Sequence, residues 1–259
     1  MKFPAPPLLL AASLCLLPRL PAQIAPQHED DATTAPQPGA DATAALQPGT
    51  DATPARAPAP QMYGKVEGDN YTSPLGFYKV KVPVLSQLGG SISDTPNVVT
   101  FDDDFSTHIS IGAFPFSREL KWEYDTRGAK DFLIFFFSSL VMPDFVARYP
   151  GSKMEDNAAF LPKFQDGSLL IFTLLPNGSF FAQRVVLGST EEPVVAKRGN
   201  LCFVKSNCVF VVSTELSERV LERSTYHKTA EEENAILRQR LLDLVEKMQF
   251  TQPAPEPKS

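Results

Sequence analysis

The feature that most constrains this fold is a low-complexity segment near the N-terminus. Three similar ten-residue stretches begin at Asp31, Asp41 and Asp51, and they consist mainly of Ala, Pro, Thr, Gln, Gly and Asp. Such a composition buries too little apolar surface to offset the entropy that is lost when the chain becomes ordered. We therefore predict a disordered spacer over residues 23–62, which leaves residues 63–250 to form one domain.

The two ends of the chain carry their own signals. Lys2 precedes a short apolar run, Leu8 to Leu17, which prolines then close. An apolar core of about ten residues is too short to span a bilayer, so it indicates a cleaved signal peptide over residues 1–22. A leucine precedes Cys15 where a lipobox requires a small residue, which disfavours a lipid anchor. At the other end, residues 251–259 hold three prolines and predict a disordered tail.

Charge and hydropathy exclude some classes of partner. The formal net charge of −6 becomes −8 when Lys2 and Arg19 leave with the signal peptide, and such a chain has no general attraction for nucleic acid or anionic lipid. The most apolar later stretch, Phe132 to Met142, is interrupted by two serines and is too short for a membrane span. We expect an exported protein, located in the periplasm or secreted.

Alternating polar and apolar residues predict strands in the first half of the domain. The pattern runs from Phe77 to Val84 and recurs over Val98–Asp102 and His108–Ala113, three strands that we expect to form an antiparallel meander. A loop is expected over Ser117–Arg127. Phenylalanines at helical spacing then predict an apolar helix over Gly128–Tyr149, which must pack against the sheet.

The second half of the domain predicts a second antiparallel set of strands and a final helix. The strands are rich in β-branched and aromatic residues, and Asp-Gly and Asn-Gly pairs between them favour tight turns. Thr229 and Glu232 form a capping box before an apolar stripe that ends at Met248. The predicted strands cover residues 153–162, 168–175, 179–187, 194–204 and 209–214. The expected class is α+β, an antiparallel β-sheet packed against an apolar helix and a C-terminal amphipathic helix.

Three stretches of this sequence resemble the PsbP-like family of photosystem extrinsic proteins. They are Tyr71–Pro83, Ile109–Phe114 and the end of the final helix, Lys247–Phe250. The resemblance covers most of residues 64–250 by pattern and is not carried by an invariant chemical motif. It implies a PsbP-like sandwich in a bacterial exported protein that binds or assembles other proteins without catalysis. It transfers no site residues to this chain.

Two cysteines, Cys202 and Cys208, remain once the predicted signal peptide is removed. They lie in a hairpin-like segment, and in an oxidising compartment this spacing favours a cross-strand disulfide. The alternative is two small buried thiols in adjacent strands. A zinc site would need further ligands, and the histidines are scattered along the chain.

The acidic turn Asp102, Asp103 and Asp104, with His108 close behind, is a candidate metal or polar site. Its carboxylates lack the alternating spacing of a calcium loop, so the alternative is a turn whose aspartates bond to their own backbone. The sequence contains no nucleophile elbow, phosphate-binding loop or dinucleotide motif. It therefore assigns no catalytic residue and no cofactor.

A second candidate surface is the basic cluster of Lys197, Arg198 and Lys205. It would suit an acidic partner, although edge strands also carry such residues to prevent aggregation. The 19 phenylalanines indicate an aromatic core, and a cleft lined by some of them would take a small apolar ligand.

Taken together, these features predict a non-catalytic exported protein that binds or helps to assemble another envelope protein. The alternative is a hydrolase or metal-dependent enzyme that uses His108 with the turn from Asp102 to Asp104.

Overall fold

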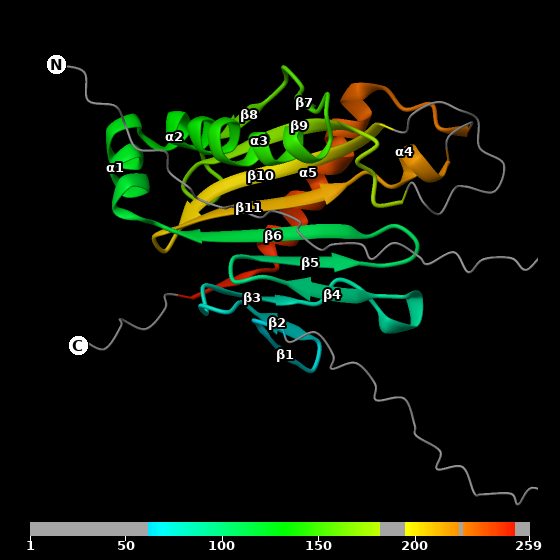
Figure 1. Cartoon of the computed structure of the whole chain (residues 1–259), viewed down its shortest axis with the longest axis horizontal. Coiled ribbons are helices and arrows are strands. Elements are labelled where there is room, and N and C mark those ends of the chain that lie inside the picture. Colours follow the sequence, from blue (N-terminus) through cyan, green and yellow to red (C-terminus); the bar gives the residue numbers. More distant parts are fainter. Residues whose placement is uncertain (1–61, 182–194, 223–224, 252–259) are drawn as a thin grey trace, which may run out of the picture. The chain divides into compact units, whose positions relative to one another are not determined.

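The computed structural model describes residues 62–181, 195–222 and 225–251 (Figure 1). The predicted signal peptide, the spacer up to residue 61, and residues 252–259 of the predicted tail lie outside these ranges, as does most of the strand predicted over 179–187. Within them, antiparallel sheets combine with a few helices, which confirms the predicted α+β class. In this described part of the chain no helix is long and apolar enough to cross a membrane.

The larger sheet has eight strands, and each strand pairs antiparallel with its neighbours. The two sets of strands predicted separately belong to this one sheet, because β6 pairs with β11. In spatial order the strands are β4 (Ser91–Asp94), β5 (Val98–Asp102), β6 (His108–Pro115), β11 (Cys208–Glu215), β10 (Val195–Lys205), β9 (Ser168–Pro176) and β7 (Lys153–Met154), with β8 (Ala159–Leu161) also on β9.

A smaller sheet joins segments from the two ends of the domain. Its order is β1 (Lys65–Glu67), β2 (Asn70–Thr72), β3 (Tyr78–Lys81) and β12 (Gln249–Phe250). The predicted antiparallel pairing of β5 with β6 is confirmed, but the prediction that β3 belongs to the same meander is wrong. The chain leaves β3 through a loop that contains the short 3₁₀ helix η1 (Ser86–Leu88), and the partners of β3 are β2 and the C-terminal β12.

Helices cover both faces of the larger sheet (Figure 1). One face carries α1 (Arg118–Arg127), α2 (Ala129–Phe136), a π-helical turn η2 (Phe137–Val141) and α3 (Met142–Arg148). The other face carries α5 (Ala230–Glu246), which contacts β10 and β11, while the short α4 (Glu218–Leu221) contacts β10. The hydrophobic core is accordingly divided into two clusters, one on each side of the sheet.

The helix α1 replaces a predicted loop. Ser117 caps it, since its side chain accepts a hydrogen bond from the backbone N–H of Leu120 at 3.2 Å. Leu120 is the only buried residue of α1, so the sequence has no apolar stripe that would have indicated a helix. By contrast, the predicted capping box of Thr229 and Glu232 is present at the start of α5.

Gly199 on β10 explains how closely α5 approaches the sheet. A Cβ atom at this position would lie 2.9 Å from the side chain of Leu241 and 3.0 Å from that of Leu237. Only glycine leaves room for both leucines, which are fully buried. The helix is thereby held against β10 and β11, next to the groove described below.

Candidate functional site

Polar side chains occupy one half of the sheet face that α1 to α3 cover. The register places them in a row across the sheet, because residues that face each other on neighbouring strands point to the same side. Along this row every side chain is at least nine-tenths buried. From β5 to β9 the row consists of Asp102, His108, Glu215, Arg198 and Thr173.

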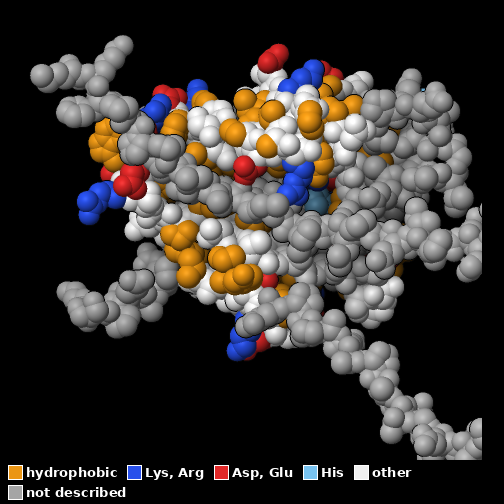
Figure 2. Space-filling view, viewed as in Figure 1, with side chains coloured by type: hydrophobic (Ala, Val, Ile, Leu, Met, Phe, Trp, Pro, Cys, Tyr) orange, Lys and Arg blue, Asp and Glu red, His pale blue; other side chains and the backbone are white. Residues whose placement is uncertain are grey.

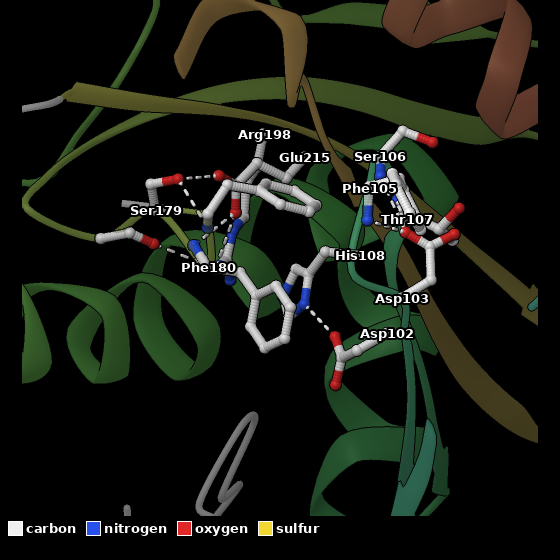
Figure 3. Close-up of polar contacts among 12 residues, drawn as sticks. Asp102, Asp103, Phe105, Ser106, Thr107, His108, Ser179, Phe180, Arg198 and Glu215 are labelled. Carbon is white, nitrogen blue, oxygen red and sulfur yellow. Dashed lines mark hydrogen bonds and ion pairs between the residues drawn. The ribbon is translucent and has the colours of Figure 1, made fainter. Parts of the chain in front are cut away.

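His108 and Asp102 form a close pair at one end of this row (Figure 3). The Nδ1 atom of His108 lies 2.5 Å from Oδ1 of Asp102, and the imidazole stacks on the ring of Phe180 with 4.9 Å between the centroids. His108 is 5% and Asp102 8% exposed. The pair therefore holds the segment around Phe180 against the end of the sheet.

Glu215 lies beside this pair and is bonded from several directions (Figure 3). Ser179 Oγ donates to its Oε1 at 2.5 Å, and the backbone N–H of Phe180 donates to its Oε2 at 3.1 Å. Arg198 Nη2 lies 3.4 Å from the same oxygen and donates to the carbonyl of Gly178 at 3.2 Å. A buried carboxylate with these partners acts as a clamp on residues 178–180.

Among the described residues, this row does not pair a serine with the histidine. Serine hydrolysis needs a serine hydroxyl bonded to a histidine that an acid orients. Here Ser179 bonds to Glu215, whereas His108 bonds to Asp102.

Two of the three aspartates of the predicted metal site, Asp102 and Asp103, have different partners: Asp102 pairs with His108, and Asp103 bonds to the backbone of its own turn. Asp103 Oδ1 accepts hydrogen bonds from the backbone N–H groups of Phe105, Ser106 and Thr107 at 2.7–2.9 Å. Burial alone would raise the pKa of Asp103, but these bonds hold it below its ordinary value. Across the described ranges, no group of three or more His, Cys, Asp or Glu side chains is placed to hold a metal ion. The predicted metal site is therefore not assembled, and Asp103 instead shapes the turn.

The predicted basic cluster is not a common surface. Lys197 is fully buried, with Nζ 3.0 Å from Glu155 Oε1 and 3.1 Å from Glu233 Oε2. Arg198 is also buried, and it points to the opposite face because successive strand residues alternate. Lys205 is more exposed and pairs with Asp166 at 3.2 Å. The structure therefore disperses these three residues, and two of them are locked inside the fold.

The disulfide predicted between Cys202 and Cys208 is not formed, since both cysteines are free. A two-residue turn at Ser206 and Asn207 places Cys208 opposite Lys205. Cys202 therefore lies in the cluster beneath α2, and Cys208 in the cluster on the α5 side of the sheet. Burial raises the pKa of both thiols well above the usual range, so they are chemically inert.

An open groove is a concave feature that the sequence did not indicate. Its volume is about 610 Å³, and its walls come from β3, the β5–β6 turn, β6, β11, α4 and α5. The residues that line it are Val80, Lys81, Val82, Pro83, Ser106, Thr107, Ile109, Thr214, Glu218, Arg240, Asp243, Leu244 and Lys247. No sequence pattern points to this set, because it comes from four segments that lie far apart in the chain, residues 80–83, 106–109, 214–218 and 240–247.

Exposed apolar side chains lie next to one end of this groove. Leu85, Leu88 and Phe105 are 60%, 41% and 58% exposed. Their two loops are neighbours, since the backbone N–H of Asp104 donates to the carbonyl of Leu88 at 3.0 Å. Because Ser106 lines the groove and directly follows Phe105, we treat Leu85, Leu88 and Phe105 as one surface, the loop patch, that adjoins the groove.

The surface over α1 to α3 has a different character (Figure 2). Hydrophobic side chains are scattered over it, and basic and acidic side chains alternate between them. Trp122 on α1 is 63% exposed, and Ile134 and Val146 are also exposed. Single exposed apolar residues of this kind are common on protein surfaces and mark no site by themselves.

Comparison with known proteins gives matches in structure alone. No family model and no curated protein matches the sequence. The structure resembles PsbP. For PsbP (CyanoP) of Synechocystis the identity is 13%, the TM-score is 0.37, and the match covers 70% of this chain and 91% of that chain.

Two further structures are similar to this chain. The Ran-binding protein Mog1p of Saccharomyces cerevisiae matches with 12% identity and a TM-score of 0.41, over 73% of this chain and 96% of that chain. A protein of Bacteroides thetaiotaomicron matches with 11% identity and a TM-score of 0.36, over 72% of this chain and 49% of that chain. The chain thus spans about half the length of the Bacteroides protein. Similarities at this level carry no argument about function.

Proposed function

We propose that this protein is a non-catalytic exported binding protein that docks another envelope protein in the groove and on the loop patch. The groove carries this proposal. Its volume of about 610 Å³ lies within the range of about 300–1,000 Å³ that is typical of binding sites. It also brings partly buried apolar side chains of the core, Val82, Ile109 and Leu244, to an open surface.

The adjoining loop patch supports a protein as the occupant. Leu85, Leu88 and Phe105 are large apolar side chains that gain from being covered, and they extend the apolar surface beyond the groove. A small molecule in the groove would leave them in water, whereas a protein partner would cover both regions.

The docking proposal is tested by photo-cross-linking in the cells that produce the protein. A photoreactive amino acid replaces Phe105 in the loop patch or Lys247 in the groove, and Trp122 on α1 serves as the exposed control. We expect one adduct of defined mass from the first two positions and none from Trp122. An adduct that forms equally from Trp122, or no adduct from the groove, would contradict docking at the groove.

Export is part of the proposal and has a separate test. A C-terminal epitope tag reports the location and the mass of the chain after fractionation. We expect the tagged protein in the periplasm or the culture medium, shortened by about 22 residues, which is the length of the predicted signal peptide. A full-length protein that stays in the cytoplasm would contradict export.

The volume of the groove also favours a second candidate, a small apolar ligand. An apolar dye such as N-phenyl-1-naphthylamine tests it, because its fluorescence rises in an apolar environment. The substitution Leu244→Arg would place a charge in the groove and should abolish such a signal if the dye binds there. A signal that Leu244→Arg leaves unchanged would remove this candidate.

A further inference from the structure

We propose that the groove recognises an acidic segment of the partner protein, with an apolar side chain on its floor and carboxylates at Lys81 and Lys247. This inference rests on the proposed function and names the chemistry of the same site.

The floor of the groove selects for an apolar anchor. Val82 directly follows β3, Ile109 lies at the start of β6, and Leu244 lies in the last turns of α5. Each is partly buried against the α5-side core. A side chain of the partner that covers them continues the core outward and removes apolar area from water.

The acidic residues that line the groove are already engaged. Arg240 donates to both carboxylate oxygens of Glu218, through Nη1 at 3.2 Å and through Nη2. Burial would raise the pKa of Glu218, but the hydrogen bonds from Arg240 hold it below its ordinary value. Asp243 accepts a hydrogen bond from Gln239 Nε2 at 2.7 Å. Glu218 is therefore paired with a cation of this chain, whereas Asp243, whose donor is an uncharged amide, keeps its negative charge at the groove. With Lys81, Arg240 and Lys247 against Glu218 and Asp243, the residues that line the groove leave an excess of one positive charge.

The lysines of the groove are not matched in this way. Lys81 has Asp69 at 4.0 Å, and both side chains are mostly exposed, 74% and 80%, so this pair contributes little. Within the described part of the chain, Lys247 makes no ion pair. The groove thus presents two ammonium groups on a chain in which acidic residues outnumber basic ones, 30 to 24. Carboxylates on the partner would complement this charge.

The open shape of the groove favours a segment of a protein over a small anionic amphiphile. The groove runs through Ser106 and Thr107 toward the loop patch, and the patch residues are about half exposed or more. A peptide of several residues covers the floor, the lysines and Phe105 together. A fatty acid would reach the floor and one lysine only.

Peptide selection tests this chemistry without knowledge of the partner. A random twelve-residue library displayed on phage is selected against the immobilised full chain. We expect the recovered peptides to be enriched in Asp and Glu next to an apolar residue. Their affinity should fall at least about tenfold for the double variant K81E/K247E, and less than about twofold for the control K130E/K163E, whose lysines are exposed outside the groove.

The outcomes separate this inference from the proposed function. Recovered peptides that are neutral or basic, or that bind K81E/K247E as well as the natural protein, overturn the acidic segment. Displacement of the peptides by dodecanoate at a lower concentration than by a competing acidic peptide would assign the groove to a small amphiphile and also overturn it. If the cross-linked adduct from Phe105 persists in K81E/K247E, docking at the groove stands and the acidic chemistry fails. If that adduct is absent from the natural protein, the proposed function fails.

Discussion

The buried polar row and the groove both gather charged side chains, but the charges are used differently. In the row, Glu215 has donors from Ser179, Phe180 and Arg198, and the whole set is at least nine-tenths buried except for Phe180. In the groove, Lys81 and Lys247 lie at an open surface with weak or no ion pairing among the described residues. In the row, the polar groups bond to one another and hold the fold together. In the groove, two lysines remain available for the partner that we propose.

This difference shows why the type of residue alone does not identify a site. The residue types that suggest catalysis are buried in the row and already bonded. His108 bonds to Asp102, and Ser179 bonds to Glu215. Lys81 and Lys247, which we propose bind the partner, lie far apart in the sequence and line the same groove only in the fold. A charged side chain that is buried and paired therefore stabilises the fold, whereas one that is exposed and weakly paired can contact a partner.

The largest effect is expected from removing a buried charge. Lys197→Met leaves the carboxylates of Glu155 and Glu233 without their shared ammonium group. Removing one partner of a buried ion pair costs about 3–5 kcal/mol. Glu233 keeps its pair with Arg219 at 2.7 Å, and the side chain of Glu155 is 17% exposed, so urea denaturation should show a loss of stability at the lower end of this range. The control Lys205→Met, on the same strand with its exposed partner Asp166, should cost less than about 1 kcal/mol. Equal losses would show that burial does not distinguish the two lysines.

A smaller loss is expected from loosening the clamp in the row. Ser179→Ala removes one hydrogen bond to the carboxylate of Glu215, which is fully buried. Hydrogen bonds to charged groups contribute about 1.5–3 kcal/mol, and urea denaturation measures the change. The control Ser106→Ala, at an exposed serine in the groove, should stay within about 0.5 kcal/mol. No loss from Ser179→Ala would mean that Glu215 does not hold this segment.

A still smaller effect concerns acid stability. Backbone hydrogen bonds hold the folded-state pKa of Asp103 below its ordinary value of 3.8. Stabilisation by its charge is therefore fully present above about pH 4 and is lost as the pH falls through the lower folded-state pKa. We expect the unfolding free energy of Asp103→Asn to fall less steeply than that of the natural protein below pH 4. A profile that Asp103→Asn leaves unchanged would contradict this role.

The smallest change in stability is expected at the groove. Lys81 and Lys247 are exposed, so K81E/K247E should keep its unfolding free energy within about 0.5 kcal/mol of the natural protein. The same variant should bind acidic peptides at least about tenfold less tightly. Thermal unfolding together with the peptide assay checks both values. A large loss of stability would show that these lysines stabilise the fold, as the charges of the row do. The two regions would then not differ in how their charges are used.

Local patterns were sufficient to predict several elements from the sequence. The strand over Val98–Asp102 has the predicted bounds, and the capping box at Thr229 begins α5 as expected. Both signals lie within a few neighbouring residues, where period and capping chemistry act. The resemblance to the PsbP-like family was also based on local stretches of this kind.

The remaining features depend on contacts between distant segments. The pairing of β3 with the two residues of β12 left no detectable pattern, and the groove needs the same long-range assembly. No local pattern predicts that Lys197 is buried, because its partners Glu155 and Glu233 are 42 and 36 positions away, as their numbers show. The disulfide prediction is wrong because it did not include the strand register. A two-residue turn places Cys202 and Cys208 on opposite faces of the larger sheet.

The measurement that tests the central claim most directly is photo-cross-linking from Lys247, compared with Trp122, in the cells that produce the protein. The groove as a docking site predicts one adduct of defined mass from Lys247 and none from Trp122 on α1, which is also exposed. An adduct from Trp122 alone, or none from either position, would contradict it.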